Sequence, residues 1–389
     1  MAIDTVPPLI SAQINYLLSH CPFSVKLEDE MTLQVEQMWS GCKNPNFLDR
    51  FTLAIPYCLD HIKWDVTFNA MYPLAAPDVI FGPEDEGFQP YAGGARKSSK
   101  NSLANWNSRD PSQLHSLIVE LRDAYMEYQR RRIGEVDDER VKFEISTMLS
   151  REGIEMFMSL GTDKVTEDDK CVWPEEVKFA VPLLDMDLNR LVAGSTWRHP
   201  QKVYLQVIFP VGKKYSSVPS PPRLKLISSP ELKALFSTED LKLPTWMDGM
   251  CTAEYLPNLE QMLNSQIKDA VSSIEIRRKF IQSLAPHLGR PIEADPVFCR
   301  KATFLCSSGV FTFQVHFTLS LQFPKQQPAL VLQSSQHFNS HGAPVKSPTL
   351  SEYPWSPRWN PSEKADRIFD FLADEALNFK KYCNQLNQQ

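Results

Sequence analysis

The stretch FTFQVHFTLSLQFPKQQPALVL, residues 311–332, carries the clearest strand pattern in the chain. Apolar residues alternate from Phe311 to Phe323, which is typical of a β-strand that buries one face. The turn Phe323-Pro324-x3-Pro328 follows, and residues 329–332 (ALVL) form the next apolar run. Because proline has no N–H to donate to a sheet, it is expected where the chain leaves a strand. The stretch therefore predicts two strands joined by a proline-bounded turn.

The residues after this stretch predict a closing helix. Trp359 precedes a run whose apolar residues recur at helical spacing: Ile368, Phe369, Leu372, Ala376 and Phe379. A tryptophan between a sheet and a helix most simply anchors both in one core. The order along the chain is thus strand, proline turn, strand, tryptophan and helix.

This order occurs twice more, earlier in the chain. The first copy has an alternating strand at residues 63–69 (KWDVTFN), the turn Tyr72-Pro73-x3-Pro77, a strand at 78–81, Trp106 and a helix from about Pro111. The second has strands at 203–209 and 223–227, with Pro219 between them and Trp246 before a long helix. In the three copies the marker proline and the tryptophan are 33, 27 and 35 residues apart (73 to 106, 219 to 246, 324 to 359).

A repeated unit of this kind predicts a repeated architecture. We expect an α+β fold of three tandem modules, each an antiparallel meander sheet covered on one face by helices. The predicted boundaries are 1–135, 136–285 and 286–389. The helix predicted over residues 257–287 is continuous, so that it closes the second module and opens the third.

Composition narrows the classes of function. The formal net charge is −6 and no long basic stretch occurs, which argues against direct binding of nucleic acid. No apolar run approaches the roughly 20 residues that cross a bilayer, and the N-terminus does not resemble a secretory signal, so no membrane association is expected. The eight cysteines are scattered without a C-x-x-C pair, which disfavours a zinc ribbon or a redox motif. We expect a protein of the cytoplasm and nucleus with reduced thiols.

With these features the chain resembles the ubiquitin-conjugase superfamily, including its RWD and ubiquitin-E2-variant branches. The resemblance rests on Tyr72-Pro73-x3-Pro77 and Phe323-Pro324-x3-Pro328, each between two strands. In the third copy, residues 336–339 (QHFN) stand where active conjugases carry His-Pro-Asn, and residues 355–357 (WSP) resemble the segment before their next helix.

An active conjugase requires a thiolate soon after the His-Pro-Asn turn. The first copy has no cysteine between Cys58 and Cys171, and residues 340–348 of the third contain none. Cys383 falls in the terminal helix, and Cys251 of the second copy follows Trp246 without a His-x-Asn ahead of it. We therefore predict that the chain is not an enzyme, and a residual conjugase that uses Cys251 is the least favoured hypothesis.

Other chemistries lack their motifs. There is no G-x-G-x-x-G, P-loop, H-E-x-x-H or G-x-S-x-G sequence. His337 and His341 are four residues apart, but they fall in a Ser/Asn/Gly-rich loop, where solvated histidines are the simpler interpretation. No catalytic residue, cofactor or metal ligand is predicted.

A closer resemblance, over nearly the whole chain, is to the scaffold subunits of BRISC-type deubiquitinase assemblies. It rests on residues 62–73 (IKWDVTFNAMYP), 103–107 (LANWN) and 353–359 (YPWSPRW). It implies a scaffold that joins a JAMM-type zinc deubiquitinase, its inactive MPN-domain partner and a von Willebrand-A-like subunit, with roles at DNA damage, in receptor signalling and at the mitotic spindle. The alternative is a ubiquitin-E2 variant that binds polyubiquitin itself and presents it to an enzyme. Trp355, Arg358 and Trp359 are the predicted partner-binding residues, because aromatic residues and arginine are enriched at binding hot spots.

Overall fold

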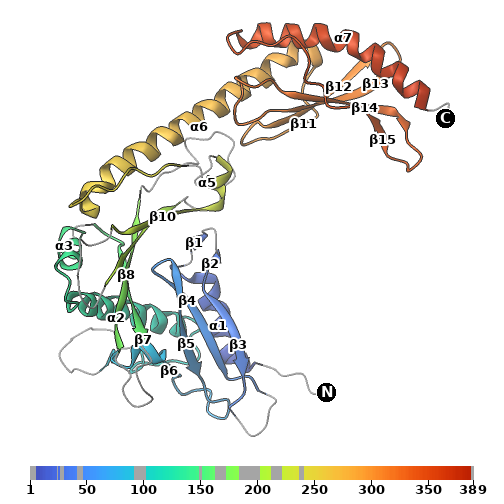
Figure 1. The fold of residues 1–389 in the computed structure, drawn as a ribbon. Coiled ribbons are helices and arrows are strands. Elements are labelled where there is room, and N and C mark those ends of the chain that lie inside the picture. Colours follow the sequence, from blue (N-terminus) through green and yellow to red (C-terminus); the bar gives the residue numbers. More distant parts are fainter. Residues whose placement is uncertain are drawn as a thin grey trace. The chain divides into compact units, whose positions relative to one another are not determined.

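The computed structural model describes residues 6–23, 25–26, 30–41, 47–91, 102–148, 151–162, 172–183, 202–211, 221–235 and 241–386. The chain divides into two compact units. The first comprises residues 1–185 and 201–261, and the second comprises residues 186–200 and 262–389. Helices and antiparallel sheets occur in both units, so the predicted α+β class is confirmed (Figure 1). The division into three modules at residues 135 and 285 stays a prediction.

The first unit begins with a four-stranded meander. Helix α1 (Pro8–His20) and the short strands β1 (Val25–Lys26) and β2 (Glu30–Met31) precede it. The sheet order is β3-β4-β5-β6, with β3 (Gln34–Trp39), β4 (Arg50–Tyr57), β5 (Asp60–Thr67) and β6 (Asp78–Ile80) all antiparallel. The short 3-10 helix η1 (Pro83–Asp85) follows, and then α2 (Gln113–Gly134). The alternation predicted at residues 63–69 therefore lies in β5.

The core of this sheet forms where the sequence places its apolar face. Trp64 and Val66 of β5 are fully buried, together with Phe51, Leu53 and Ile55 of β4. The apolar stripe of α2 covers them: Leu114, Leu117, Ile118, Leu121 and Tyr125. Helix α1 packs on the same core through Ile10, Ile14 and Leu17.

The second sheet also belongs to the first unit. After α3 (Glu139–Met148), its order is β10-β9-β8-β7, with β7 (Glu155–Thr162), β8 (Val172–Pro182), β9 (Val203–Pro210) and β10 (Arg223–Ser228). The helix α5 (Pro230–Leu235) follows. Trp246 then lies between Phe209 of β9 (6.5 Å between ring centroids) and Tyr255 of the next helix, α6 (Thr252–Leu288; 5.3 Å). Trp246 thus links sheet and helix as predicted, whereas the predicted proline turn at Pro219 lies outside the described residues.

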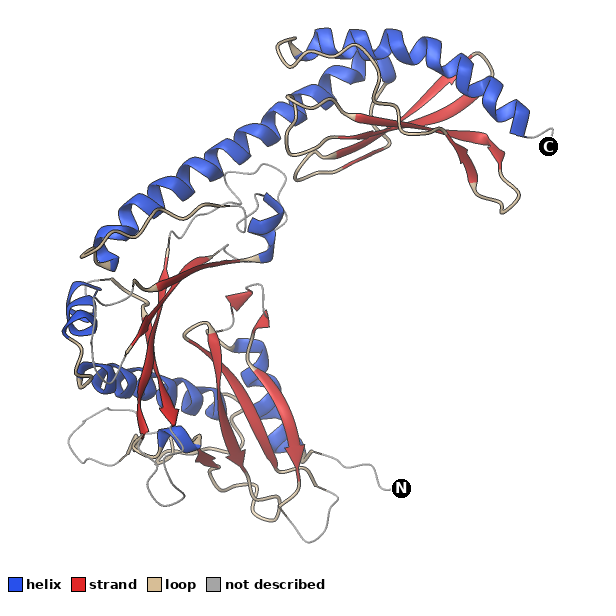
Figure 2. Ribbon diagram, in the orientation of Figure 1, coloured by secondary structure: helices blue, strands red, loops and turns tan. Residues whose placement is uncertain are grey.

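The second unit contains the five-stranded sheet β11-β12-β13-β14-β15. Its strands are β11 (Glu293–Ala294), β12 (Lys301–Ser308), β13 (Phe311–Thr318), β14 (Ala329–Phe338) and β15 (Pro344–Lys346). The last turns of α6 (Thr252–Leu288) and the whole of α7 (Pro361–Leu386) lie on one face of it, where Phe280 contacts Phe317 and Phe379 contacts Phe311 (Figure 2).

Two expectations about these elements can be compared with the structure. The continuous helix predicted over residues 257–287 is confirmed as part of α6. The strand predicted from Phe311 to Phe323 is too long, because β13 ends at Thr318. Leu319 and Phe323 are nevertheless buried, since the turn that follows β13 folds these two side chains into the core, whereas Leu321 between them is exposed.

Candidate partner-binding surfaces

The predicted partner-binding residues lie in the segment Tyr353–Trp359, called here the aromatic segment. The aromatic segment runs beside the proline turn of the second unit, residues 323–328. The Tyr353 hydroxyl donates a hydrogen bond to the carbonyl oxygen of Pro328, and the Trp355 indole N–H donates to the carbonyl oxygen of Pro324 (3.0 Å). Both prolines of the Phe323-Pro324-x3-Pro328 turn are therefore held by the aromatic segment. Two motifs that the sequence presents separately form one structure.

Trp355 is surrounded by the second unit's own side chains. Its ring contacts those of Phe280 (6.0 Å between centroids) and Phe323 (5.6 Å). The Lys364 ammonium lies 5.4 Å from the Trp355 ring centroid and donates hydrogen bonds to the carbonyl oxygens of Pro357 (3.1 Å) and Trp359 (2.6 Å). Burial lowers the pKa of Lys364, because the charged form loses water. Trp355 thus anchors α7 to the sheet.

The other two predicted residues are more accessible. Trp359 is half-buried, and the Arg367 guanidinium of α7 lies 5.8 Å from the centroid of its ring. Arg358 is exposed. Of the three predicted partner-binding residues, Arg358 is therefore the one whose side chain is open to solvent, and the binding role of all three stays a prediction.

The loop that resembles a conjugase His-Pro-Asn turn stabilises itself. The Asn339 side-chain oxygen accepts hydrogen bonds from the backbone N–H groups of His341 and Ala343, both at 3.0 Å. His337 Nδ1 lies 2.9 Å from the Ser334 hydroxyl, while His341 is exposed. Asn339 therefore closes the β14–β15 turn with its side-chain oxygen.

The pKa values of four of the described cysteines are shifted away from that of an activated thiolate. Burial raises the pKa of the Cys306 thiol to about 11, and it also raises the pKa values of Cys58, Cys299 and Cys383. A nucleophilic cysteine requires the opposite shift. Cys251 is buried and lines a cleft of about 260 Å³ with the aromatic residues Phe143, Phe209 and Trp246.

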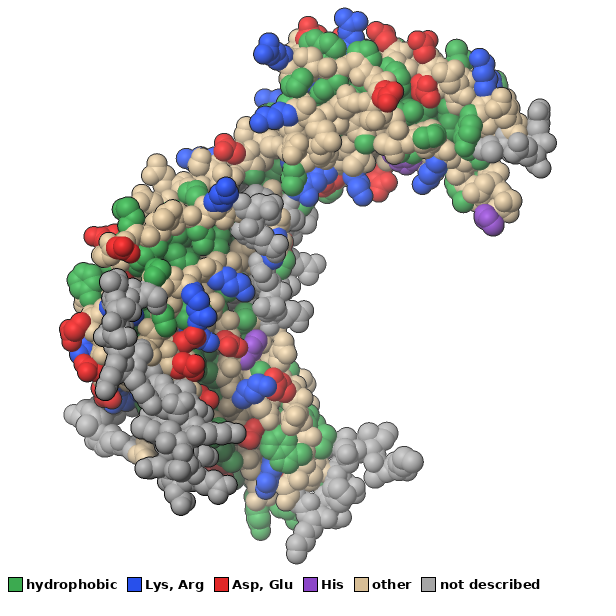
Figure 3. Space-filling view, in the orientation of Figure 1, with side chains coloured by type: hydrophobic (Ala, Val, Ile, Leu, Met, Phe, Trp, Pro, Cys, Tyr) green, Lys and Arg blue, Asp and Glu red, His purple; other side chains and the backbone are tan. Residues whose placement is uncertain are grey.

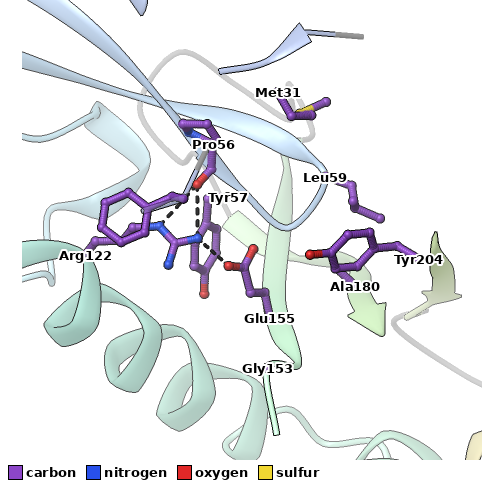
Figure 4. A pocket seen from close by; sticks show the side chains of 10 residues that line it. Met31, Pro56, Tyr57, Leu59, Arg122, Gly153, Glu155, Ala180 and Tyr204 are labelled. Atoms are coloured by element: carbon purple, nitrogen blue, oxygen red, sulfur yellow. Dashed lines mark hydrogen bonds and ion pairs between the residues drawn. The ribbon is translucent and has the colours of Figure 1, made fainter. Parts of the chain in front are cut away.

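A polar arrangement in the first unit joins its two sheets, and we call it the sheet junction. It consists of Arg122 on α2, Glu155 on β7, and the β4–β5 hairpin from Pro56 to Leu59 (Figure 4). The Arg122 guanidinium donates to the Pro56 carbonyl oxygen through Nε (3.2 Å) and Nη2 (3.1 Å), and Nη2 also pairs with the Glu155 carboxylate. The other carboxylate oxygen accepts the Cys58 backbone N–H (2.6 Å). A cavity of about 60 Å³ lies beside these groups.

The hairpin tip has a backbone shape that few residues adopt without help. Cys58 and Leu59 both have positive φ angles, 51° and 62°, as in a two-residue type I′ turn where Asn-Gly is usual. The Cys58 N–H bond to Glu155 and the Cys58 thiol, which lies 3.5 Å from the Lys178 carbonyl oxygen, hold this turn against the second sheet. Strained turns of this kind persist only where the surroundings fix them.

The junction also covers the edge of the second sheet. Strand β7 is the last strand of its sheet, so part of its backbone has no strand partner. The Tyr57 hydroxyl donates to the Met156 carbonyl oxygen (2.8 Å), and the Gln129 side chain accepts the Met158 N–H (3.3 Å). Side chains from β4 and α2 therefore satisfy this edge.

Sequence reasoning did not single out the sheet junction. A signal was present in α2, where Arg122 falls four residues after Ile118 and so lies on the buried stripe. A charged residue at such a position requires a buried partner. The partner itself, Glu155, is 33 residues away in the chain, so no local pattern identifies it.

Neither a metal site nor a membrane-spanning helix is found within the described residues. They contain no group of three or more histidine, cysteine, aspartate or glutamate side chains that could hold a metal ion. No helix in the same ranges is both long and apolar enough to span a membrane. Acidic and basic side chains are interspersed on the face shown in Figure 3.

Comparison with known proteins gives the family. The sequence profile described as "Brain and reproductive organ-expressed protein (BRE)" matches residues 4–338. The chain belongs to the BRE family. The resemblance inferred from the quoted segments is thereby confirmed as membership of this family.

Two curated relatives of this BRE-family chain span almost its whole length. A Danio rerio protein named "BRISC and BRCA1-A complex member 2" is 31% identical over 368 residues, which is 92% of this chain and 90% of that protein. A Branchiostoma floridae protein of the same name is 27% identical over 346 residues, 87% of this chain and 85% of that protein. The similarity therefore includes both compact units of the BRE-family fold.

Proposed function

We propose that this chain is a non-catalytic scaffold subunit of a deubiquitinase complex of the BRISC and BRCA1-A type. The observation that carries the proposal is the family match over residues 4–338, together with two relatives named as members of these complexes. Both relatives align along about nine-tenths of this chain, so the similarity is not confined to one unit.

In the proposed complex the chain binds a JAMM-type zinc deubiquitinase, the MPN-domain pseudo-enzyme that accompanies it and a von Willebrand-A-like subunit. The zinc belongs to the enzyme. The complex acts on polyubiquitin in the cytoplasm and, in the DNA-damage response, in the nucleus.

Each large sheet is proposed to be one ubiquitin-E2-variant or RWD module without conjugating activity. Three antiparallel meanders that follow one another in the chain support the module assignment. The raised thiol pKa values of Cys58 and Cys306, and the lack of a cysteine in residues 340–348 after Asn339, support the absence of conjugation.

The proposal is tested by tagging the chain in its own cells and assaying the purified material on polyubiquitin. We expect activity that is lost when a zinc chelator is added and that is absent from the recombinant chain alone. Tagged material without such activity would refute the assignment to a deubiquitinase complex.

Two further assays separate the remaining hypotheses. The recombinant chain is incubated with ubiquitin-activating enzyme, a conjugase and ATP, and the Cys251→Ser variant is treated in the same way. We expect no ubiquitin thioester on the chain, and therefore no difference between the two proteins. If the recombinant chain alone retains polyubiquitin on a column, the E2-variant hypothesis of direct ubiquitin binding is favoured instead.

A further inference from the structure

Strand β6 ends the first sheet, and nothing among the described residues pairs with its outer side. The pairing of β4 with β5 determines which way the backbone N–H and C=O groups of β6 point. Tyr57 and Asp60, which close the hairpin, form a hydrogen-bonded pair. Every second residue of β5 from Asp60 onward therefore bonds β4, and the Phe68 N–H bond to the Asp49 carbonyl oxygen (2.8 Å) fits this alternation. The backbones of Asp65 and Thr67 therefore face β6 and bond Ile80 and Asp78. Val79, between them, directs its N–H and C=O away from the sheet.

The edge strands β7 and β6 of this unit differ. On β7, the Tyr57 and Gln129 side chains bond the Met156 carbonyl oxygen and the Met158 N–H. Among the described residues none bonds the outward N–H and C=O of Val79, whose side chain is half-buried. An unpaired strand edge is a site where an extended segment can add a strand.

A groove of about 340 Å³ runs beside this edge, between β6 and α2. Its apolar lining residues are Val79, Phe81, Tyr91, Leu103, Leu117 and Leu121. Leu117 and Leu121 are buried residues of α2, so the groove reaches the core, whereas Tyr91 at its mouth is 44% exposed. A side chain that projects from an added strand could enter the groove, because alternate residues of a strand point to the same face.

The charged groups at the part of the groove that the structure describes are acidic. Asp78 is exposed and lines the groove. Glu120 lies near Tyr91: burial, and to a smaller extent the negative charge of Glu120, raise the pKa of the Tyr91 phenol to about 12. Among the described residues no lysine, arginine or histidine lines the groove. A lysine or arginine beside the apolar residues of the incoming segment would complement this charge.

We infer that the β6 edge and its groove form a docking site for an extended segment of a partner protein. The segment adds a strand to β6 through the outward N–H and C=O of Val79. It places an apolar side chain against Phe81, Tyr91 and Leu103, and a basic side chain near Asp78 and Glu120. This inference goes beyond complex membership, because it names the surface and the chemistry of the segment that binds it.

The test uses the full chain in its own cells, with the photo-crosslinking residue p-benzoylphenylalanine in place of Tyr91. The crosslinked peptide is identified by mass spectrometry, and the same residue at Phe143 serves as the control because Phe143 lies on helix α3, lines a different cleft and is 57% exposed. We expect a Tyr91-specific crosslink to a partner segment that has apolar residues at alternate positions and a lysine or arginine. A crosslink to a second copy of this chain, to a helix, or at no more than the Phe143 level would overturn the inference.

A matched pair of substitutions tests the main-chain bonds. Val79→Pro removes the outward N–H and leaves the bonds to β5, while Val79→Ile keeps the N–H and a similar side chain. Val79→Pro should lower the Tyr91 crosslink about fivefold or more, as expected for an interface that loses a main-chain hydrogen bond. Val79→Ile should not lower it. Unchanged hydrogen exchange in β5 checks that Val79→Pro folds, and an undiminished crosslink in that folded variant would overturn strand addition.

These outcomes are independent of the proposed function. If chelator-sensitive activity does not accompany the tagged chain, the deubiquitinase assignment fails, and the Tyr91 crosslink still decides whether this docking site exists.

Discussion

Replacing Glu155 with glutamine should open the sheet junction. Each carboxylate oxygen of Glu155 accepts one hydrogen bond, from Arg122 and from the Cys58 N–H. Glutamine has one oxygen and one NH2 group, so it can satisfy only one of these two donors. The side chain of Arg122 is 8% exposed, and it would keep its charge without a carboxylate partner.

The expected cost follows from this geometry. Removing one partner of a buried ion pair typically costs about 3–5 kcal/mol. Glu155 is 23% exposed and Arg122 keeps the Pro56 carbonyl oxygen, so about 2–4 kcal/mol is expected here. The surface pair Lys63–Glu36 provides the control, because Glu36→Gln should cost less than about 1 kcal/mol.

Hydrogen exchange is the appropriate assay, because two compact units need not unfold in one transition. The opening free energy is measured on peptides from β4, β5 and β7 for Glu155→Gln, Arg122→Met and the double variant. We expect the double variant to lose clearly less stability than the two single losses combined, since neither charge is then left unpaired. Single losses that simply add, or that stay below about 0.5 kcal/mol, would refute the coupling derived from the structure.

Three further predictions concern the second unit. Tyr353→Phe should lower the opening free energy of β14 by about 1–2 kcal/mol in hydrogen exchange, because the buried Pro328 carbonyl oxygen loses its donor; an unchanged value would contradict this. Burial raises the pKa of Cys306 to about 11 and raises that of Tyr353, so these two groups ionise at lower pH in the unfolded chain. Their contribution to stability is fully present below about pH 8.5 and should be lost as the pH rises toward 11. Urea unfolding at several pH values checks this fall, and Cys306→Ala should make it less steep. Arg358→Glu should weaken partner binding about fivefold or more at an unchanged melting temperature, while Lys346→Glu, also exposed, should not.

The sequence predicted β5, β6, β9, β10, β13 and β14, and where the burial has a simple period the reason is visible. Trp64 and Val66 alternate with the exposed Lys63 and half-buried Asp65, so the buried face of β5 is visible in the residues themselves. The predicted end of β13 was wrong because it relied on the same alternation. Leu319 and Phe323 continue the apolar alternation in the sequence, but they are buried by the following turn instead of by the strand.

The candidate surfaces were less predictable. Trp355 was a reasonable interface residue from its type, yet its indole N–H bonds Pro324 and its ring packs on Phe280, contacts that depend on the folded chain. Similarly, Val79 looks like an ordinary strand residue. Its free edge exists only because β6 is the last strand of its sheet and no side chain covers it among the described residues.

Helix α6 also determines when the first unit can complete its core during synthesis of the chain. The boundary between the two units falls between Gln261 and Met262, inside this helix. Tyr255, Leu256 and Leu259 are buried residues that emerge from the ribosome some fifty residues after Phe209, itself buried in the second sheet. A product that stops before Thr252 would therefore lack part of the first unit's core and should be degraded, even though all strands of that unit have already been made.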